Sequence, residues 1–359
     1  MTGKQTCDIL KQIRRDIAKK NDINIPIRDC PHGEDVRCPG TCPRCEAETR
    51  ALEKALNDRE KNGKKLLIAG ISAGLVAGTI AGVAPARLSR AINSKAMFRR
   101  YTPQMTAPAW TMNRQKQIHA LSKAISPLPR KHPEHPQKQT AADLRPMADK
   151  KTADVFAIIR HRIPTDGDGV TTLVGLKGCP LACKYCLNPQ CGTAKSERLT
   201  ADELYEKVRI DDLYFIATGG GITFGGGEPL IWTDFILDFI NYAKPRADWK
   251  FTLETSLAVA LDDTTLAALA ENIDLFIVDI KDTDPTIYRS YTGGDISLVL
   301  RNLGTLAAIV PGKIRVKLPL IPGFNAEKNL DKSEQIAKKL GVSQIARINY
   351  IIPGKVCQD

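Results

Sequence analysis

Hydrophobic and polar positions along residues 169–359 predict strands and helices in turn. Six short apolar runs predict strands, at residues 170–178, 221–227, 249–255, 273–280, 313–320 and 344–352. Helical patterns separate them, for example at residues 201–209, 233–243, 263–272, 297–309 and 331–341. Because a helix-length segment separates each strand from the next, we expect parallel strands with right-handed crossovers. Six such units predict an α/β fold with a partial (β/α)6 TIM-like barrel, in which active residues lie at the C-terminal strand ends.

The front part of the chain has a different pattern. Ile9, Ile13 and Ile17 recur every fourth position and predict a short amphipathic helix over residues 4–20. Residues 46–65 are rich in charge and predict a surface helix that ends near Gly63. These two helices flank a loop rich in cysteine, proline and glycine, so the sequence predicts a small helical, Cys-rich N-terminal domain.

A stretch without any charged side chain covers residues 66–85. About 20 such residues can span a bilayer as a helix. Glycines recur every fourth position from Gly70 to Gly82, which lets a neighbouring helix approach closely. The sequence therefore predicts a glycine-zipper helix that attaches to a membrane. A buried helix of small residues within a soluble fold is the alternative.

Charge is distributed unevenly along the chain. The net charge of +12 divides into +15 for residues 1–151 and −3 for residues 152–359. Residues 88–151 are basic and rich in proline, which predicts an extended linker. We expect no nucleic-acid binding, because no aromatic-basic interleaving or known nucleic-acid module accompanies the charge. The predicted organisation is a Cys-rich domain (1–62), a glycine-zipper segment (63–87), a linker (88–151) and the barrel (152–359).

Ten cysteines occur in clusters, which is typical of metal chemistry in a reducing compartment rather than of a disulfide scaffold. The first cluster is Cys30, Cys38, Cys42 and Cys45. Four thiolates on such a loop can surround one ion tetrahedrally. Zinc is the favoured occupant of this second metal site, and a second iron–sulfur cluster is the alternative.

The other cluster, CPLACKYC, stands at the end of the first predicted barrel strand. Cys179, Cys183 and Cys186 offer three thiolates to a four-iron cluster and leave one iron open. A zinc loop completed by Cys191 is the alternative. The next strand ends in GGGEP, residues 225–229. With Tyr185 before the last cysteine, the two motifs in this order resemble the radical S-adenosylmethionine (SAM) superfamily.

This resemblance implies a [4Fe–4S] cluster and SAM as cofactors, with Cys179, Cys183 and Cys186 as the catalytic cluster ligands. It implies reductive cleavage of SAM to a 5′-deoxyadenosyl radical that abstracts a hydrogen atom. Glu228 is expected near the methionyl amine and Tyr185 near the adenine edge. The full set implied to bind SAM is Tyr185, Gly226, Gly227, Glu228, Thr255, Asp279 and Lys281. Lys281 can pair with the methionyl carboxylate; a surface ion pair with Asp279 is the alternative.

Within the superfamily, five stretches resemble the glycyl-radical-enzyme activases of the pyruvate formate-lyase activating type. They are GITFGGGEPL, FTLETS, DLFIVDIKD, YTGGD and VKLPLIPGFN, and the resemblance runs from Thr171 to the end of the chain. It implies an anaerobic oxidoreductase that installs a radical on a glycine of a partner glycyl radical enzyme. A flavodoxin or ferredoxin is the implied electron donor. Because the cluster needs low-potential electrons and no oxygen, the barrel is expected in the cytoplasm. The uncharged stretch at residues 66–85 adds the expectation of attachment to the inner membrane.

The chain departs from the family pattern at several places. Gly225 stands where Ser or Thr is usual, and Glu254 stands where Asp is commoner. No ferredoxin-like insert separates the two motifs, and the chain stops at Asp359, soon after the sixth strand. These departures concern the substrate, so radical modification of a peptide or small molecule is a second hypothesis. A membrane-tethered interaction protein with a degenerate barrel is the third.

Overall fold

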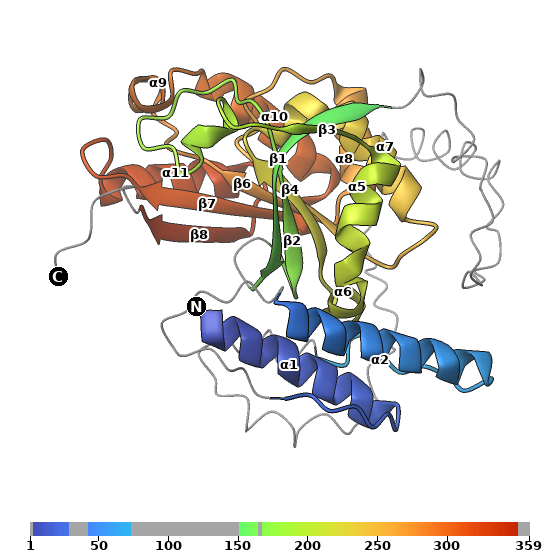
Figure 1. Cartoon of the computed structure of the whole chain (residues 1–359). Coiled ribbons are helices and arrows are strands. Elements are labelled where there is room, and N and C mark those ends of the chain that lie inside the picture. The colour runs from blue at the N-terminus through green and yellow to red at the C-terminus, as the bar shows by residue number, and fades with distance from the viewer. Residues whose placement is uncertain (1–2, 29–41, 73–150, 164–166, 351–359) are drawn as a thin grey trace, which may run out of the picture. The chain divides into compact units, whose positions relative to one another are not determined.

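The computed structural model describes residues 3–28, 42–72, 151–163 and 167–350. Within them lies an eight-stranded sheet in the order β3-β1-β2-β4-β5-β6-β7-β8 (Figure 1). Six neighbouring strands run parallel. They are β2 (Thr171–Leu176), β4 (Gly221–Gly226), β5 (Lys250–Thr255), β6 (Leu275–Asp279), β7 (Ile314–Leu320) and β8 (Gln344–Asn349). The six predicted strands and their parallel pairing are confirmed.

Two further strands, which the sequence analysis did not predict, extend one edge of the sheet. β1 (Thr152–Arg162) pairs antiparallel with both β2 and β3 (Glu197–Thr200). Arg160 and His161 of β1 contact the buried carboxylate of Asp211. Asp211 Oδ1 lies 2.6 Å from Arg160 Nη2 and 2.8 Å from His161 Nε2. Burial alone would raise the pKa of Asp211, but His161 and Arg160 outweigh it and hold the pKa at about 2.

The helices follow the strands along the chain. They are α5 (Ala201–Val208), α6 (Asp212–Thr218), α7 (Thr233–Ala243), α8 (Asp263–Asn272), α9 (Pro285–Thr292), α10 (Ile296–Ile309) and α11 (Glu327–Lys339). Short 3-10 turns are η3 (Pro189–Cys191), η4 (Arg209–Asp211), η5 (Pro229–Trp232) and η6 (Pro311–Lys313). Thr200 and Glu203 form a capping box that starts α5. The five predicted helices of this region are present, and α11 begins earlier than expected, at Glu327.

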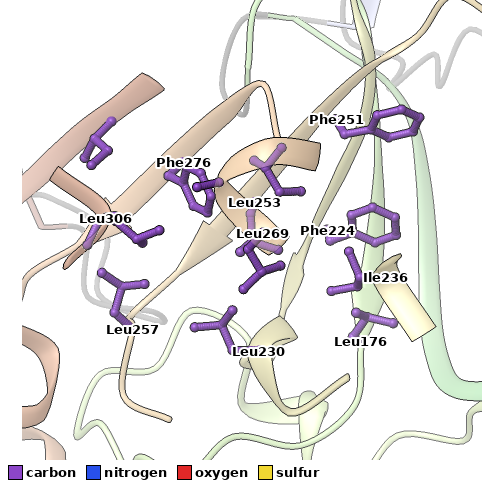
Figure 2. Close-up of a cluster of buried hydrophobic side chains, with 14 of the residues drawn as sticks. Leu176, Phe224, Leu230, Ile236, Phe251, Leu253, Leu257, Leu269, Phe276 and Leu306 are labelled. Atoms are coloured by element: carbon purple, nitrogen blue, oxygen red, sulfur yellow. The ribbon is translucent and has the colours of Figure 1, made fainter. Parts of the chain in front are cut away.

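The main core lies between the parallel strands and the helices that connect them. Phe224, Phe251 and Phe276 come from three adjacent strands and are fully buried beside Ile236 of α7 and Leu269 of α8 (Figure 2). Each such side chain contributes about 1.5–3 kcal/mol through its burial. Because side chains alternate along a strand, the intervening residues face the other side of the sheet. That side carries small and polar groups, such as Thr223, Glu254 and Lys317.

Two N-terminal helices, α1 (Gly3–Lys20) and α2 (Pro43–Lys61), lie side by side (Figure 1). Both helices occur where the sequence predicted them. Ile13 of α1 and Leu52 of α2 are fully buried in one cluster with Tyr214 of α6 and Val170. The second helix is a surface helix as predicted, and the face that carries Leu52 and Leu56 is buried. Val170 immediately precedes β2, so α1 and α2 pack at the N-terminal end of the parallel strands.

Polar contacts join the same helices to the rest of the fold. Arg14 is fully buried; its Nη1 donates to the hydroxyl of Tyr214 at 2.5 Å and its Nη2 to Glu48 Oε2 at 2.9 Å. Thr49 and Tyr214 share a hydrogen bond of 3.0 Å. A second ion pair joins Arg160 Nη1 to Glu46 Oε1 at 3.1 Å. These contacts fix α1 and α2 against β1 and α6.

The predicted glycine-zipper helix is only partly described. Residues 66–72 are not helical, so the prediction of a helix from residue 66 onward is wrong there. Leu67 N donates to Asn21 Oδ1, while Gly70 N and Ser72 N donate to carbonyls of α6. Residues 73–85, like most of the linker, lie outside the described residues. Within the ranges that the structure describes, no helix has the length and apolar character needed to cross a bilayer.

Candidate functional site

The loop that carries Cys179, Cys183 and Cys186 follows the end of β2. Its backbone is bonded to the C-terminal end of α9: Ala182 N donates to the carbonyl of Thr292 at 2.8 Å and Lys184 N to that of Tyr291 at 3.0 Å. These acceptors belong to the YTGGD stretch, so the structure explains this part of the sequence pattern. The loop is therefore held at the C-terminal end of the parallel strands, where a barrel of this kind places its chemistry.

The thiols of this loop differ in exposure. Cys179 is exposed, whereas Cys183 and Cys186 are half-buried. Partial loss of hydration around the sulfur atoms raises the pKa of the half-buried Cys183 thiol to about 11, and it does the same for Cys179 although that residue as a whole is exposed. Both groups are therefore thiols at neutral pH, and metal binding here displaces protons. Cys191 is buried, and its charge acts on Cys179, which places it close to the same loop.

An aromatic cluster surrounds Tyr185. Its ring lies 6.1 Å from that of Tyr291 and 5.7 Å from that of Phe324, both edge-to-face. Tyr350, just after β8, donates its hydroxyl to the carbonyl of Tyr185 at 2.5 Å. The sequence analysis assigned no role to Tyr291, Phe324 or Tyr350. Tyr291 and Phe324 belong to two stretches that resemble the activase family, YTGGD and VKLPLIPGFN. Membership of these stretches is the sequence feature that could have pointed to both residues.

Glycines bring the backbone at the end of β4 close to its neighbours. Gly226 has a φ of +88°, a left-handed conformation that favours glycine. A Cβ on Gly227 would lie 2.1 Å from the carbonyl oxygen of Gly178 and 2.6 Å from that of Leu176. A Cβ on Gly226 would lie 3.0 Å from the Phe156 ring. The GGGEP stretch therefore lies directly against the start of the cysteine loop.

Gly227→Ala is expected to destabilise the protein by about 1–3 kcal/mol, because the new methyl group meets fixed backbone carbonyls rather than a movable side chain. Gly192→Ala is the matched control, since nothing lies within 4 Å of a Cβ at that position. The measurement is the urea midpoint of both variants and the parent. Equal midpoints for Gly227→Ala and Gly192→Ala would contradict the close approach.

Glu228 is fully buried and ties two strand ends together. Its Oε1 accepts from Thr255 Oγ1 at 2.5 Å and from Leu230 N at 3.1 Å. Its Oε2 accepts from the backbone N and the hydroxyl of Ser256. Burial raises the pKa of Glu228, and these four donors oppose that rise. Glu228 and Thr255, both predicted site residues, are thus in direct contact, and Ser256 is a further partner that the sequence analysis missed.

A pair of charges follows the end of β6. Lys281 Nζ lies 2.5 Å from Asp279 Oδ2, and both side chains are largely shielded from solvent. Burial alone would lower the pKa of Lys281, but the Asp279 carboxylate holds it above its ordinary value. Asp279 Oδ1 is buried and has no hydrogen-bond partner among the described residues. Lys317 of β7, which the sequence analysis did not single out, pairs with Glu254 Oε1 of β5 at 2.8 Å, and β6 lies between these two strands.

The structure thus brings the predicted site residues of the barrel to the C-terminal ends of β2, β4, β5 and β6. Three thiols on one loop supply the soft ligands of an iron–sulfur cluster. The glycine backbone, the unpartnered Asp279 oxygen and the Lys281 ammonium supply groups suited to an amino acid's amine and carboxylate. These residues fit a [4Fe–4S] cluster and SAM.

Metal-ligand geometry itself is not preformed. Across the described ranges, no three or more His, Cys, Asp or Glu side chains are gathered closely enough to hold a metal ion. Of the four predicted N-terminal ligands, Cys42 and Cys45 lie at the start of α2, whereas Cys30 and Cys38 fall outside the described residues.

Comparison with known proteins gives one family and a consistent set of relatives. Residues 173–331 match the model of the radical SAM superfamily. The isethionate sulfite-lyase activating enzyme of Nitratidesulfovibrio vulgaris is 27% identical over 261 residues, covering 55% of this chain and 84% of that protein. The pyruvate formate-lyase 2-activating enzyme of Escherichia coli is 28% identical, covering 54% and 75%.

A third relative is the pyruvate formate-lyase-activating enzyme of Clostridium pasteurianum, 29% identical over 52% of this chain and 77% of that protein. The matched residues contain the cysteine loop, the glycine turn and the Asp279–Lys281 pair described above. The family implies a [4Fe–4S] cluster and SAM, in agreement with the donor chemistry of the site. Residues 173–331 therefore form a radical SAM domain.

Proposed function

We propose that this protein activates a glycyl radical enzyme by abstracting a hydrogen atom from a glycine of that partner. The observation that carries the proposal is the similarity to activating enzymes over 75–84% of the length of three relatives. The cysteine loop, glycine turn and charged pair at one end of the parallel strands support it, because they supply what SAM-dependent radical chemistry needs.

In this proposal Cys179, Cys183 and Cys186 would hold the [4Fe–4S] cluster and would leave one iron without a protein ligand, available to SAM. When both are bound, an electron from the cluster cleaves SAM to methionine and a 5′-deoxyadenosyl radical, which takes hydrogen from the substrate. A flavodoxin or ferredoxin supplies the electron in a reducing cytoplasm. The partner supplies the glycine.

The chain's own residues orient the methionyl group. Lys281 donates to the carboxylate, and the free oxygen of Asp279 accepts from a nearby cation or donor. Glu228 helps to position the amine by fixing Gly226 and Gly227 against the Thr255–Ser256 backbone. Tyr185 lines the adenine edge within its aromatic cluster. Burial of these polar groups excludes water, which strengthens each contact.

The test uses the full chain, reconstituted anaerobically with iron and sulfide. SAM, a low-potential reductant and a glycyl radical enzyme encoded nearby are added, and the mixture is examined by electron paramagnetic resonance. A stable protein radical is expected, with 5′-deoxyadenosine formed as co-product. The matched control is the same partner with its radical-site glycine replaced by alanine, which is expected to give no such signal.

Two outcomes separate the parts of the proposal. If 5′-deoxyadenosine forms but no partner carries a radical, the glycyl radical assignment is wrong, while SAM cleavage stands. Modification of a short peptide encoded nearby would then support the second hypothesis of the sequence analysis. If neither product forms, the proposal fails at the SAM site itself.

A further inference from the structure

Cys42 and Cys45, at the start of α2, form a pair of thiols with different surroundings. Cys42 is the N-cap residue, a proline follows it, and Cys45 lies in the first turn. Cys42 is half-buried, whereas Cys45 is only 3% exposed. The two side chains are in contact, with the Cys45 thiol as hydrogen-bond donor and the Cys42 sulfur as acceptor. One sulfur is therefore accessible to a reactant, and the other lies directly behind it.

Positive charge surrounds this pair. Lys11 of α1 is 1% exposed and close enough to act electrostatically on Cys42. Arg14 Nη2 lies 3.7 Å from Cys45 Sγ. Lys11 and Arg14 are three residues apart, so they share a face of α1. The positive end of the α2 dipole adds to these charges, and such surroundings stabilise a thiolate.

The charge at this place is unbalanced unless one of the two sulfur atoms is a thiolate. Arg14 has a carboxylate partner in Glu48. Lys11 Nζ, however, is buried without a hydrogen-bond partner among the residues that the structure describes. A buried ammonium without a counter-charge is strongly unfavourable. A thiolate at Cys42, which accepts from the Cys45 thiol, supplies the single negative charge that Lys11 requires.

Two sulfur atoms are enough for a disulfide, whereas a metal ion needs a larger set of ligands. Cys7 of α1 is buried beside Cys45, but no metal-binding group of three or more His, Cys, Asp or Glu side chains exists in the described part of the chain. Two cysteines three positions apart at a helix N-terminus are instead typical of reactive dithiols. In a reducing compartment, disulfides of such pairs are transient and act in catalysis or redox sensing.

We propose that Cys42 and Cys45 form a thiol–disulfide exchange site for disulfides of low-molecular-weight thiols. A small reactant suits the partial exposure of Cys42. The Cys42 thiolate attacks one sulfur of the small disulfide, whose S–S bond breaks, so that one thiolate leaves and a mixed disulfide forms on Cys42. Cys45 then loses its proton, and its sulfur attacks the Cys42 sulfur. A Cys42–Cys45 bond forms and the second small thiolate leaves. The pair loses two electrons and two protons, and the small disulfide gains them as two free thiols.

This exchange site is separate from the radical site. α1 and α2 pack at the start of β2, whereas the radical-site cysteines follow its end. Six strand residues separate the two places by about 20 Å. Oxidation of Cys42 and Cys45 therefore leaves the thiols of the cluster loop untouched.

The experiment treats the anaerobically reconstituted full chain with glutathione disulfide and maps disulfides by mass spectrometry of tryptic peptides. Trypsin cleaves after Arg44, so a Cys42–Cys45 bond joins the peptides 38–44 and 45–50. This joined pair is expected in the parent. In Cys45→Ser a stable glutathione adduct on Cys42 is expected instead, because the resolving thiol is absent. In Cys42→Ser we expect Cys45 to react at least about 10-fold more slowly, because it is buried and not activated.

Cys7→Ser is the matched control, and it is expected to give the same joined peptides as the parent. Fragment spectra distinguish Cys42 from Cys38, which lies in the same tryptic peptide. A bond from Cys45 to Cys7 or to Cys38, in place of Cys42, would overturn the proposal. Protection of both thiols until a chelator is added would also overturn it, because that result would indicate a bound metal.

A variant outside the cysteines tests the activation of Cys42. Lys11→Met removes the charge beside Cys42, so a smaller fraction of Cys42 is thiolate at neutral pH. A tenfold loss of thiolate, partly offset by the greater nucleophilicity of the remainder, makes the reaction with glutathione disulfide about threefold slower. Lys19→Met, at an exposed position of the same helix, is expected to leave the rate unchanged. Equal rates in Lys11→Met and the parent would contradict the assignment of Cys42 as the activated thiolate.

Discussion

Cys183→Ala is expected to lower the rate of 5′-deoxyadenosine formation by at least about 100-fold. Loss of residues that only support a metal ligand already costs 10–100-fold, and Cys183 is proposed as a ligand itself. Cys183 lies at the middle of the loop and close to Lys281. The measurement is product formation with SAM and reductant after anaerobic reconstitution, with iron counted in the same sample.

Cys191→Ser is the matched control for this prediction. Cys191 is buried near Cys179, five residues after Cys186, so it is the cysteine that a four-thiolate zinc loop would require. We expect Cys191→Ser to keep its iron and its activity. Equal loss in the two variants would indicate a four-cysteine site instead. Iron near zero in the parent, unchanged in Cys183→Ala, would support the degenerate barrel.

Arg14→Ala is expected to destabilise the protein by about 3–5 kcal/mol. The substitution removes the cation between Glu48 and Tyr214, and leaves a carboxylate that is 9% exposed without its partner. Because these groups connect α1, α2 and α6, the effect falls on the attachment of the N-terminal helices. Urea unfolding followed by circular dichroism measures this loss as a lower unfolding midpoint.

The neighbouring Arg15→Ala provides the control, since Arg15 is exposed and its removal is expected to change stability by less than about 0.5 kcal/mol. The double variant Arg14→Met/Glu48→Leu tests the reason for the loss. Replacing both charges by apolar groups removes the unpaired carboxylate, so it is expected to recover much of the stability. A double variant as unstable as Arg14→Ala would show that the charge imbalance is not the cause.

The barrel could be predicted from sequence because its strands are short, apolar and separated by helical patterns. The residues of β4 and β6 are almost all buried, so their apolar runs are continuous. β1 was not predicted, because Arg160 and His161 interrupt its run of apolar residues. These side chains are compatible with a buried strand because Asp211 and Glu46, both at least 50 positions away, pair with them, and a local pattern does not contain that information. The helix expected from residue 66 failed for a similar reason, since hydrogen bonds to α6 hold residues 66–72 in another conformation.

The site was predictable wherever a motif lies at a strand end. The cysteine loop, Gly226, Gly227, Glu228 and the Asp279–Lys281 pair lie at the strand ends where the sequence predicted them, and their roles in cofactor binding stay predictions. Partners that reach the site from distant segments could not be predicted. Tyr350, for example, lies 165 positions from Tyr185 and donates its hydroxyl to the Tyr185 carbonyl. Lys317 belongs to the stretch VKLPLIPGFN, but nothing in that stretch distinguishes it from its neighbours. The structure distinguishes it, because Lys317 lies opposite Asp279 in the register of β6 and β7 and pairs with Glu254.

The hydrogen bond between Arg14 and Tyr214 joins residues 200 positions apart, and this has a consequence for synthesis of the chain on the ribosome. α2 is complete once Lys61 has emerged, but α6 follows only after about 150 further residues. At 5–20 residues per second, the N-terminal helices wait roughly 8–30 s for their docking surface. During this interval Ile13 and Leu52 have no barrel to cover them. The nascent N-terminal segment is therefore the part of this protein that most needs a chaperone before the barrel is made.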